Sequence, residues 1–363
     1  MDLLVDKQAT PTGPNQLCAD PIFILGIMPR CGTNFLYNLL SLHPHCHGVG
    51  MRDMPEDHLL LNANLLERYA NNVASFWSRH GLRGKDEPDR QRYNQELRDQ
   101  LFACLGEGLV AYLNHLNPDP GVKPVLTKTP FVRNLSQFFN LFPRARLIIL
   151  VRDGRAVAES SVKSFNTSYE VVMHRWAEAA QEILEFDRVH RHVNGQYLIV
   201  KYEDILDHLE VEMRSVLNFL GLSPEAYNFD MAVNLPVFGS SEEFAKAREA
   251  AIADPDQSGW QVVNKCKQKF NPKSRWSHWS PAQHCRFNWI AGDYMEQFGY
   301  ELEQASSVTG GVRNRLLDLK WASTSWAMAQ VHRWERILYA IYTTKRRYQD
   351  LRMENEDTSF WIS

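Results

Sequence analysis

The sequence predicts an α/β fold: a central parallel sheet flanked by helices, with a helical extension at the C-terminal end. Three apolar runs have the composition of buried strands, namely Ile22–Leu25, Arg146–Val151 and Tyr197–Val200. A helical pattern follows each run, and alternation of strands with helices is typical of parallel sheets that are covered on both faces. We therefore expect a single domain with about five parallel strands.

Proline and glycine residues mark the ends of several predicted elements. Pro44 stops the first helix and Gly221 closes a later one, because proline disfavours helix in the preceding residue and glycine adopts the left-handed conformation that ends helices. A further strand is expected over Pro124–Leu126, and residues 238–270 should be rich in loops. Helices are predicted over Thr33–Leu42, Asn62–His115 with a polar interruption near 81–91, Arg155–Phe165, Gln181–Val193, Glu210–Leu220, Pro281–Phe298 and Val312–Arg352.

These elements fall into three parts. Residues 1–20 are expected to be a flexible lead-in, residues 21–305 to form the domain, and residues 306–363 to form the helical extension. The extension carries several tryptophans followed by a basic run, Lys345–Arg347. It is expected to dock on its own domain or on a second subunit, as in a homodimer. Acidic residues follow the basic run, which disfavours a helix lying on a membrane surface.

The bulk composition excludes several classes of protein. Forty basic residues against forty-three acidic ones give a net charge of −3, so nucleic acid is not expected as a partner, since that binding depends on clustered basic charge. No run approaches the ~20 apolar residues of a membrane span, and the N-terminal residues lack the pattern of a signal peptide. Six cysteines are scattered without a C-x-x-C pair, which favours a reducing compartment. We predict a cytoplasmic protein without a transmembrane segment.

The first strand leads into a turn suited to binding an anion. The turn carries Pro29, Arg30 and Gly32, and a helical pattern begins near Thr33. A strand, a tight loop and a helix N-terminus direct backbone N–H groups and the positive end of the helix dipole at one place, which suits a phosphate. The loop lacks the Gly-Lys-Ser/Thr ending of a nucleoside-triphosphate loop, so the anion is expected to belong to a donor other than ATP or GTP.

A second polar turn follows the strand that ends at Val151. Arg152 and Asp153 come directly after this strand, and Ser160 lies on the helix that follows. Ligands collect at the carboxyl ends of parallel strands, so Arg152 is expected at the same rim as the first loop. Its planar, permanently charged guanidinium suits a phosphate. Pairing of Arg152 with Asp153 or with a helix end is the alternative.

Together, PRCGT from Pro29 and VRDGRAVAES from Val151 resemble the two binding motifs of the sulfotransferases that use 3′-phosphoadenosine 5′-phosphosulfate. The resemblance covers roughly residues 21–300. It implies a P-loop-like domain and this nucleotide as co-substrate. It also implies that the donor is held by Arg30, Cys31, Gly32, Thr33 and Asn34 at its 5′ end, Arg152 and Ser160 at its 3′-phosphate, Tyr202 at its adenine, and Lys273, Ser274, Arg275 and Trp276 in a segment that closes over it.

The same resemblance implies the chemistry. Lys128 in the Lys-Thr-Pro segment matches a family lysine that contacts the transferring sulfuryl group, but Pro130 replaces the histidine base of the cytosolic relatives. A carboxylate base is therefore expected, with Glu56 preferred to Asp57 and then Asp53, since partial burial would raise its pKa into a useful range. The alternative is that Glu56 and Asp57 begin a helix, where acidic residues favour the dipole.

Cys31 stands where the family has serine. Its position beside Arg30 and a helix N-terminus predicts a lowered thiol pKa and a modifiable side chain. Metal binding is not expected from the histidines near residue 45, because their spacing does not match a zinc pattern.

The predicted reaction is transfer of a sulfuryl group to a hydroxyl, or to an amine. A small molecule, lipid or sugar is preferred as acceptor to protein tyrosine, for want of a secretory signal. The alternatives are a P-loop kinase-like nucleotide enzyme and a non-catalytic nucleotide-binding module. A kinase-like enzyme would be expected to have a loop that ends in Gly-Lys-Ser/Thr. Measured transfer activity would exclude the non-catalytic module.

Overall fold

A computed structural model describes residues 20–48, 56–81, 87–115, 124–192, 195–235, 275–303 and 310–357 of the chain. The predicted loop-rich segment 238–270 and all of the predicted lead-in except Asp20 lie outside the described residues. The chain divides into two compact units. One comprises residues 1–279 and 290–302, and the other comprises residues 280–289 and 303–363. The sheet and the candidate site belong to the first unit.

The sheet has five parallel strands in the order β2-β3-β1-β4-β5, which confirms the predicted central parallel sheet. Their bounds are β1 Ile22–Gly26, β2 His47–Gly48, β3 Val125–Thr129, β4 Arg146–Val151 and β5 Tyr197–Lys201. The chain leaves β1 towards β3 and later returns to the other side of β1 as β4. The boundary between β1 and β4 is therefore a switch point, where ligands of open α/β sheets bind beyond the carboxyl ends of the strands.

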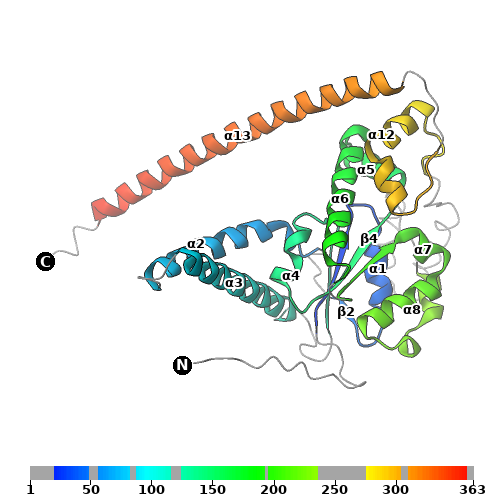
Figure 1. The fold of residues 1–363 in the computed structure, drawn as a ribbon, viewed down its shortest axis with the longest axis horizontal. Coiled ribbons are helices and arrows are strands. Elements are labelled where there is room, and N and C mark those ends of the chain that lie inside the picture. The colour runs from blue at the N-terminus through cyan, green and yellow to red at the C-terminus, as the bar shows by residue number, and fades with distance from the viewer. Residues whose placement is uncertain are drawn as a thin grey trace. The chain divides into compact units, whose positions relative to one another are not determined.

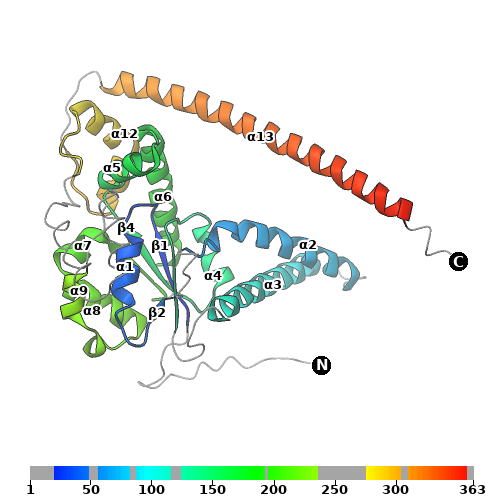
Figure 2. The same cartoon turned by 180° about the vertical axis from the view of Figure 1, so that it is seen from behind.

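Helices cover both faces of this sheet. Figures 1 and 2 show α1 and α8 on one side of the strands and α4 on the other. The ring of Phe139 on α4 stacks with that of Phe186 on α6 at 5.8 Å, so these two helices share a layer. The described α-helices that lie wholly in this unit are α1 Thr33–Leu40, α2 Ala63–Gly81, α3 Glu87–His115, α4 Phe138–Leu141, α5 Gly154–Phe165, α6 Tyr169–His190, α7 Tyr202–Asp207, α8 Leu209–Leu220 and α9 Phe229–Asn234.

The core is formed by the apolar strands and the aromatic residues that cover them. Every residue of β1 and β3 is buried, as are all residues of β4 except Arg146. Phe23 on β1 stacks on Phe142 with ring centroids 4.6 Å apart and meets Phe138 edge-on at 5.3 Å. Strands buried on both faces need continuous apolar runs, which is why these segments could be recognised in the sequence.

Element boundaries agree with the prediction in some places and differ in others. The helix α2 ends at Gly81 and α3 begins at Glu87, in agreement with the polar interruption predicted near 81–91, and the two helices lie side by side in Figure 1. A β-carbon added at Gly106 on α3 would lie 1.7 Å from the carbonyl oxygen of Leu141, so glycine permits close packing of α3 on α4. The helix α6 begins at Tyr169 rather than at Gln181, because the Ser168 hydroxyl accepts a hydrogen bond from the Val171 N–H and caps it.

The second unit contains the predicted helical extension. Its helix α13 runs over Gly310–Asp357, and the first part of α12, Pro281–Gln297, also belongs to it. Arg286 forms a 2.8 Å ion pair with Asp318, which also accepts a 2.8 Å hydrogen bond from the Trp289 indole. These contacts join α12 to the start of α13. Among the described helices, none has an apolar stretch long enough to cross a bilayer.

Candidate functional site

The loop between β1 and α1 is held tightly at the switch point. The Ile27 N–H donates to the Leu150 carbonyl at 2.9 Å, which fixes the start of the loop to β4. Arg30 and Gly32 both have left-handed backbone, with φ of 76° and 107°. A β-carbon at Gly32 would lie 2.5 Å from the ring of Tyr202, so only glycine fits there. The loop therefore has the compact form expected of an anion cradle at a helix N-terminus.

The turns that follow β1 and β4 meet through two arginines. The Arg30 Nε donates to the Ser160 hydroxyl at 3.1 Å, and the Arg152 Nη1 donates to the Arg30 carbonyl at 2.9 Å. Arg30 is half-buried, whereas Arg152 is buried. Both residues were predicted from the sequence to bind opposite ends of one nucleotide. The structure brings them into direct contact across more than a hundred residues of chain.

A third arginine lies within electrostatic range of this pair. Burial lowers the pKa of Arg30, and the charge of Arg152 lowers it further. Burial likewise lowers the pKa of Arg275, followed by the charges of Arg152 and Arg30. Like charges disfavour one another most strongly where water is excluded. The cluster of Arg30, Arg152 and Arg275 is therefore suited to an anion carrying more than one negative charge.

Two aromatic residues position Arg152. Its guanidinium lies over the ring of Tyr202, 4.3 Å from the centroid, and the Trp176 indole donates to its carbonyl oxygen at 3.2 Å. Tyr202 is only 2% exposed, because Gly32 packs against its ring. The Tyr202 ring also meets the ring of Phe35 on α1 edge-on, with centroids 6.1 Å apart. Its predicted contact with adenine stays a prediction.

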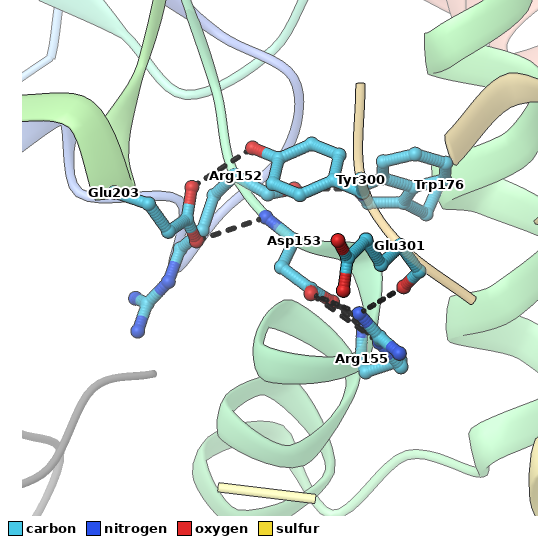
Figure 3. Close-up of polar contacts among 7 residues, drawn as sticks. All are labelled: Arg152, Asp153, Arg155, Trp176, Glu203, Tyr300 and Glu301. Carbon is cyan, nitrogen blue, oxygen red and sulfur yellow. Dashed lines mark hydrogen bonds and ion pairs between the residues drawn. The ribbon is translucent and has the colours of Figure 1, made fainter. Parts of the chain in front are cut away.

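The second arginine of the motif, Arg155, has a different environment from Arg152. In Figure 3 the two side chains extend in opposite directions from the same turn. The Arg155 Nη2 lies 2.6 Å from the Asp153 Oδ2, and the Nε lies 3.0 Å from the Oδ1. The same Nη2 donates to the Glu301 carbonyl at 3.0 Å. Arg155 thus holds the turn together and ties it to the chain that follows α12.

The Glu203 carboxylate also holds the turn at Asp153 in place. The Asp153 N–H donates to the Glu203 Oε1 at 3.1 Å, and the Tyr300 hydroxyl donates to the Oε2 at 2.8 Å (Figure 3). Burial raises the pKa of Glu203. Three residues of this arrangement were not predicted from the sequence, namely Arg155, Glu203 and Tyr300. Glu203 could have been suspected, because it is the neighbour of Tyr202 at the end of β5.

The predicted catalytic residues come together at the end of β3. Lys128 lies on β3 rather than in a following loop, with its Nζ 3.5 Å from the Glu56 Oε1. Its side chain is 5% exposed and that of Glu56 is 26% exposed. The His58 Nε2 lies 3.3 Å from the other Glu56 oxygen. The pairing register places Lys128 level with Ile24, so this carboxylate–lysine pair lies at the same edge of the sheet as the Arg30 loop.

Asp57 has a more enclosed environment than Glu56. Its Oδ2 accepts a 2.7 Å hydrogen bond from the Thr127 hydroxyl, and its Oδ1 accepts a 2.9 Å bond from the Leu59 N–H. Burial raises the pKa of Asp57, although these hydrogen bonds oppose the shift. The hydrogen bond to Thr127 joins Asp57 to β3, whereas the Glu56 oxygens lie against the side chains of Lys128 and His58. Asp53 lies outside the described residues.

The predicted lowering of the Cys31 thiol pKa was wrong. Its thiol is fully buried, and this burial raises the pKa to about 11. Hydrogen bonds from the loop and the charge of Arg152 act in the opposite direction but are outweighed. The helix N-terminus and nearby arginine did suggest a reactive thiolate, but desolvation dominates. A β-carbon at Gly26 would lie 2.4 Å from the sulfur, so Cys31 fills space beneath the loop.

The remaining predicted binding residues have varied positions. Thr33 is buried at the first turn of α1, whereas Asn34 is exposed. The Trp276 ring lies under the Arg155 guanidinium, 4.5 Å from centroid to Cζ. Lys273 and Ser274 lie outside the described residues. Within the described part of the chain, no group of three metal-ligating side chains is gathered.

Comparisons with known proteins agree with this architecture. A model of the sulfotransferase family matches residues 21–226, more than half of the chain. Protein-tyrosine sulfotransferase 2 of Gallus gallus is 26% identical over 216 residues, covering 56% of this chain and 52% of the relative. Protein-tyrosine sulfotransferase 1 of Danio rerio is 26% identical over 257 residues, covering 67% and 62%. The chain thus spans between about half and two thirds of the length of these curated relatives.

Among solved structures, the sulfotransferase domain of the Synechococcus PCC 7002 olefin synthase aligns with a TM-score of 0.47 at 21% identity, covering 80% of this chain and 98% of that domain. The family model spans both arginine-bearing turns and the strand that carries Lys128. The chain therefore belongs to the sulfotransferase family.

Proposed function

We propose that this protein transfers a sulfuryl group from 3′-phosphoadenosine 5′-phosphosulfate to a hydroxyl, or to an amine, of an acceptor. The contact of Arg30 with Arg152 at the switch point carries this proposal. A donor with phosphates at both its 3′ and 5′ ends needs two separate cationic subsites that are close together. Arg275 adds a third charge to the same region.

The two turns bind opposite ends of the donor. The Arg30 loop, from Arg30 to Asn34, takes the phosphosulfate end, because it leads into the N-terminus of α1, where backbone N–H groups and the positive end of the helix dipole favour an anion. Arg152 and Ser160 take the 3′-phosphate. Tyr202 lines the adenine, and the segment 273–276 closes over the nucleotide. The pairing of Arg30 with Ser160 then changes when donor binds, since both side chains turn towards a phosphate.

Glu56 and Lys128 supply the chemistry. The Glu56 carboxylate takes the proton of the acceptor hydroxyl while the acceptor oxygen forms a bond to sulfur. The bond between sulfur and the bridging oxygen breaks, and adenosine 3′,5′-bisphosphate leaves with the electron pair. Lys128 stabilises the charge on that oxygen. Its Nζ lies 3.5 Å from the Glu56 Oε1, so the two side chains are close enough to act on the acceptor and on the leaving group of the same reaction.

Binding and transfer can be tested separately. Calorimetric titration should show binding of adenosine 3′,5′-bisphosphate and much weaker binding of ATP, and the reverse order would favour the P-loop kinase alternative. Glu56→Gln should bind the bisphosphate normally but lower turnover by about 10²–10⁴-fold, the usual contribution of a general base. Glu67→Gln is a matched control, because Glu67 lies on α2 and accepts a 2.8 Å hydrogen bond from Gln137. Unchanged turnover in Glu56→Gln would assign the base elsewhere.

The acceptor is proposed to be a small molecule, a lipid or a sugar. Tyrosine in a polypeptide is a second class, favoured by the curated relatives that are named protein-tyrosine sulfotransferases. Incubation with donor and either a metabolite extract or tyrosine-containing peptides, followed by mass spectrometry for sulfonated products, separates the two. Sulfonation of peptides alone would reject the first class.

A homodimer through the C-terminal helices is part of the proposal. The residues Val312, Leu316 and Leu319 on α13 are 71%, 62% and 68% exposed, and they lie four and three residues apart on one face. Light scattering of the wild-type protein should give twice the monomer mass. The Leu316→Glu variant should give the mass of a monomer.

A cytoplasmic location is also part of the proposal, because the six cysteines of the sequence are scattered without a C-x-x-C pair, which favours a reducing compartment. Cell fractionation tests this location.

A further inference from the structure

A buried glutamate beside the anion site has no role in the proposed reaction. Glu159 on α5 is completely buried, and its Oε1 accepts hydrogen bonds of 2.5 Å from the Tyr169 hydroxyl and the Trp279 indole. Burial would raise the pKa of Glu159, but these hydrogen bonds and the charges of His278 and Lys163 outweigh it and hold the pKa below its ordinary value. A buried carboxylate with this many partners fixes the groups around it.

The partners of Glu159 lie on two separate segments. Tyr169 begins α6, whereas Trp279 and His278 belong to the turn formed by residues 275–279. The His278 Nε2 lies 3.2 Å from the Glu159 Oε1, and the Trp279 N–H donates to the Trp276 carbonyl at 2.8 Å. Glu159 therefore joins the turn 275–279 to α5.

The same turn is held at a second point. Arg155, one helical turn before Glu159 on α5, lies against the Trp276 ring at 4.5 Å. Two residues of one helix thus contact the two tryptophans of the turn. Arg275, the first described residue of this turn, lies within electrostatic range of Arg30 and Arg152. Ser160, the neighbour of Glu159, accepts the hydrogen bond from Arg30.

We infer that Glu159 is a positioning residue: it anchors the turn 275–279 through Trp279 and so holds Arg275 at the anion site. This inference rests on the proposed function. Glu159 touches no reacting atom, and its side chain acts through the indole of Trp279. Lys163 and His278 are more than half exposed, so the buried hydrogen bonds, rather than these ion pairs, carry the anchoring.

The test is the affinity for adenosine 3′,5′-bisphosphate, measured by calorimetry. Glu159→Ala should weaken binding by about tenfold, and Glu159→Gln, which keeps an oxygen acceptor for the indole, should restore most of it. Turnover at saturating donor should change much less than KM. Trp279→Phe removes the N–H donor while it keeps an aromatic ring, and it should weaken binding in the same way, which keeps the test valid if Glu159→Ala does not fold.

Two controls separate positioning from general damage. In an Arg275→Ala background, Glu159→Ala should cause no further loss of affinity, because residues that act through one another are not additive. Glu182→Gln changes a half-buried glutamate on α6, which accepts from the Leu135 N–H at 2.9 Å, and should leave binding unchanged. Wild-type affinity in both Glu159→Ala and Trp279→Phe, or full additivity with Arg275→Ala, would overturn the inference. Failure of the wild-type protein to bind the bisphosphate would instead reject the proposed function.

Discussion

Two arginines three residues apart should respond in opposite ways to substitution. Arg155 is 6% exposed and Asp153 is 4% exposed, and their ion pair is 2.6 Å long. Removing one partner of a buried pair leaves an uncompensated charge, which typically destabilises by about 3–5 kcal/mol. Arg155→Met should therefore lower the free energy of unfolding by this amount. It also removes the donor to the Glu301 carbonyl, which adds to the loss.

Arg152→Met should have little effect on stability but should weaken nucleotide binding. It loses the 2.9 Å hydrogen bond to the Arg30 carbonyl but also removes repulsion between Arg152 and the other arginines. These effects oppose each other, so stability without ligand should change by less than the ~1.5–3 kcal/mol that a hydrogen bond to a charged group contributes. Affinity for adenosine 3′,5′-bisphosphate should fall by about 10- to 100-fold, because a hydrogen bond to a charged group contributes ~1.5–3 kcal/mol.

Urea unfolding without ligand measures the first quantity, and calorimetric titration measures the second. The double variant Asp153→Asn with Arg155→Met should be less destabilised than the two single effects added together, since the pair is already broken. The assignment is refuted if Arg155→Met loses affinity while its stability is unchanged. It is equally refuted if Arg152→Met loses several kcal/mol of stability and binds normally.

Three further outcomes are expected. Gly106→Ala should destabilise the protein by about 1–3 kcal/mol through overpacking, whereas Gly108→Ala, with nothing within 4 Å, should stabilise it by about 0.5–1 kcal/mol in thermal or urea unfolding. Cys104 is exposed and should be alkylated long before Cys31, whose raised pKa and burial protect it, as read by mass spectrometry of peptides. Burial raises the pKa of Asp57, so the folded protein holds that proton more tightly than the unfolded chain. Relative to Asp57→Asn, the wild type should therefore lose stability as pH rises from below ~4, measured by urea unfolding across pH.

The parts of the fold that were predicted are those with local signals. The strand β4 and the helix α8 match the predicted segments closely, because one is a continuous apolar run and the other ends at Gly221 with φ of 71°. The first half of α6 and the two-residue β2 were not predicted. The short strand exists only because it pairs with β3, and the start of α6 depends on one serine cap.

In the candidate site, too, the features that could be predicted are those with a local signal in the sequence. Arg152 follows an apolar strand directly and Arg30 lies in the turn after another, so their meeting at one rim could be inferred from parallel-sheet geometry. The Glu159–Trp279 contact joins residues separated by 120 positions, and no local pattern indicates it. Cys31 shows the limit of neighbour-based reasoning: adjacent charges were visible in the sequence, but the degree of burial was not.

The left-handed backbone at residue 30 has an evolutionary consequence. An L-residue with a side chain sits there at a disadvantage of roughly 1–2 kcal/mol, which glycine would avoid. Libraries selected for heat resistance alone should therefore drift towards glycine or asparagine at this position. Libraries selected for catalysis should keep arginine despite the penalty.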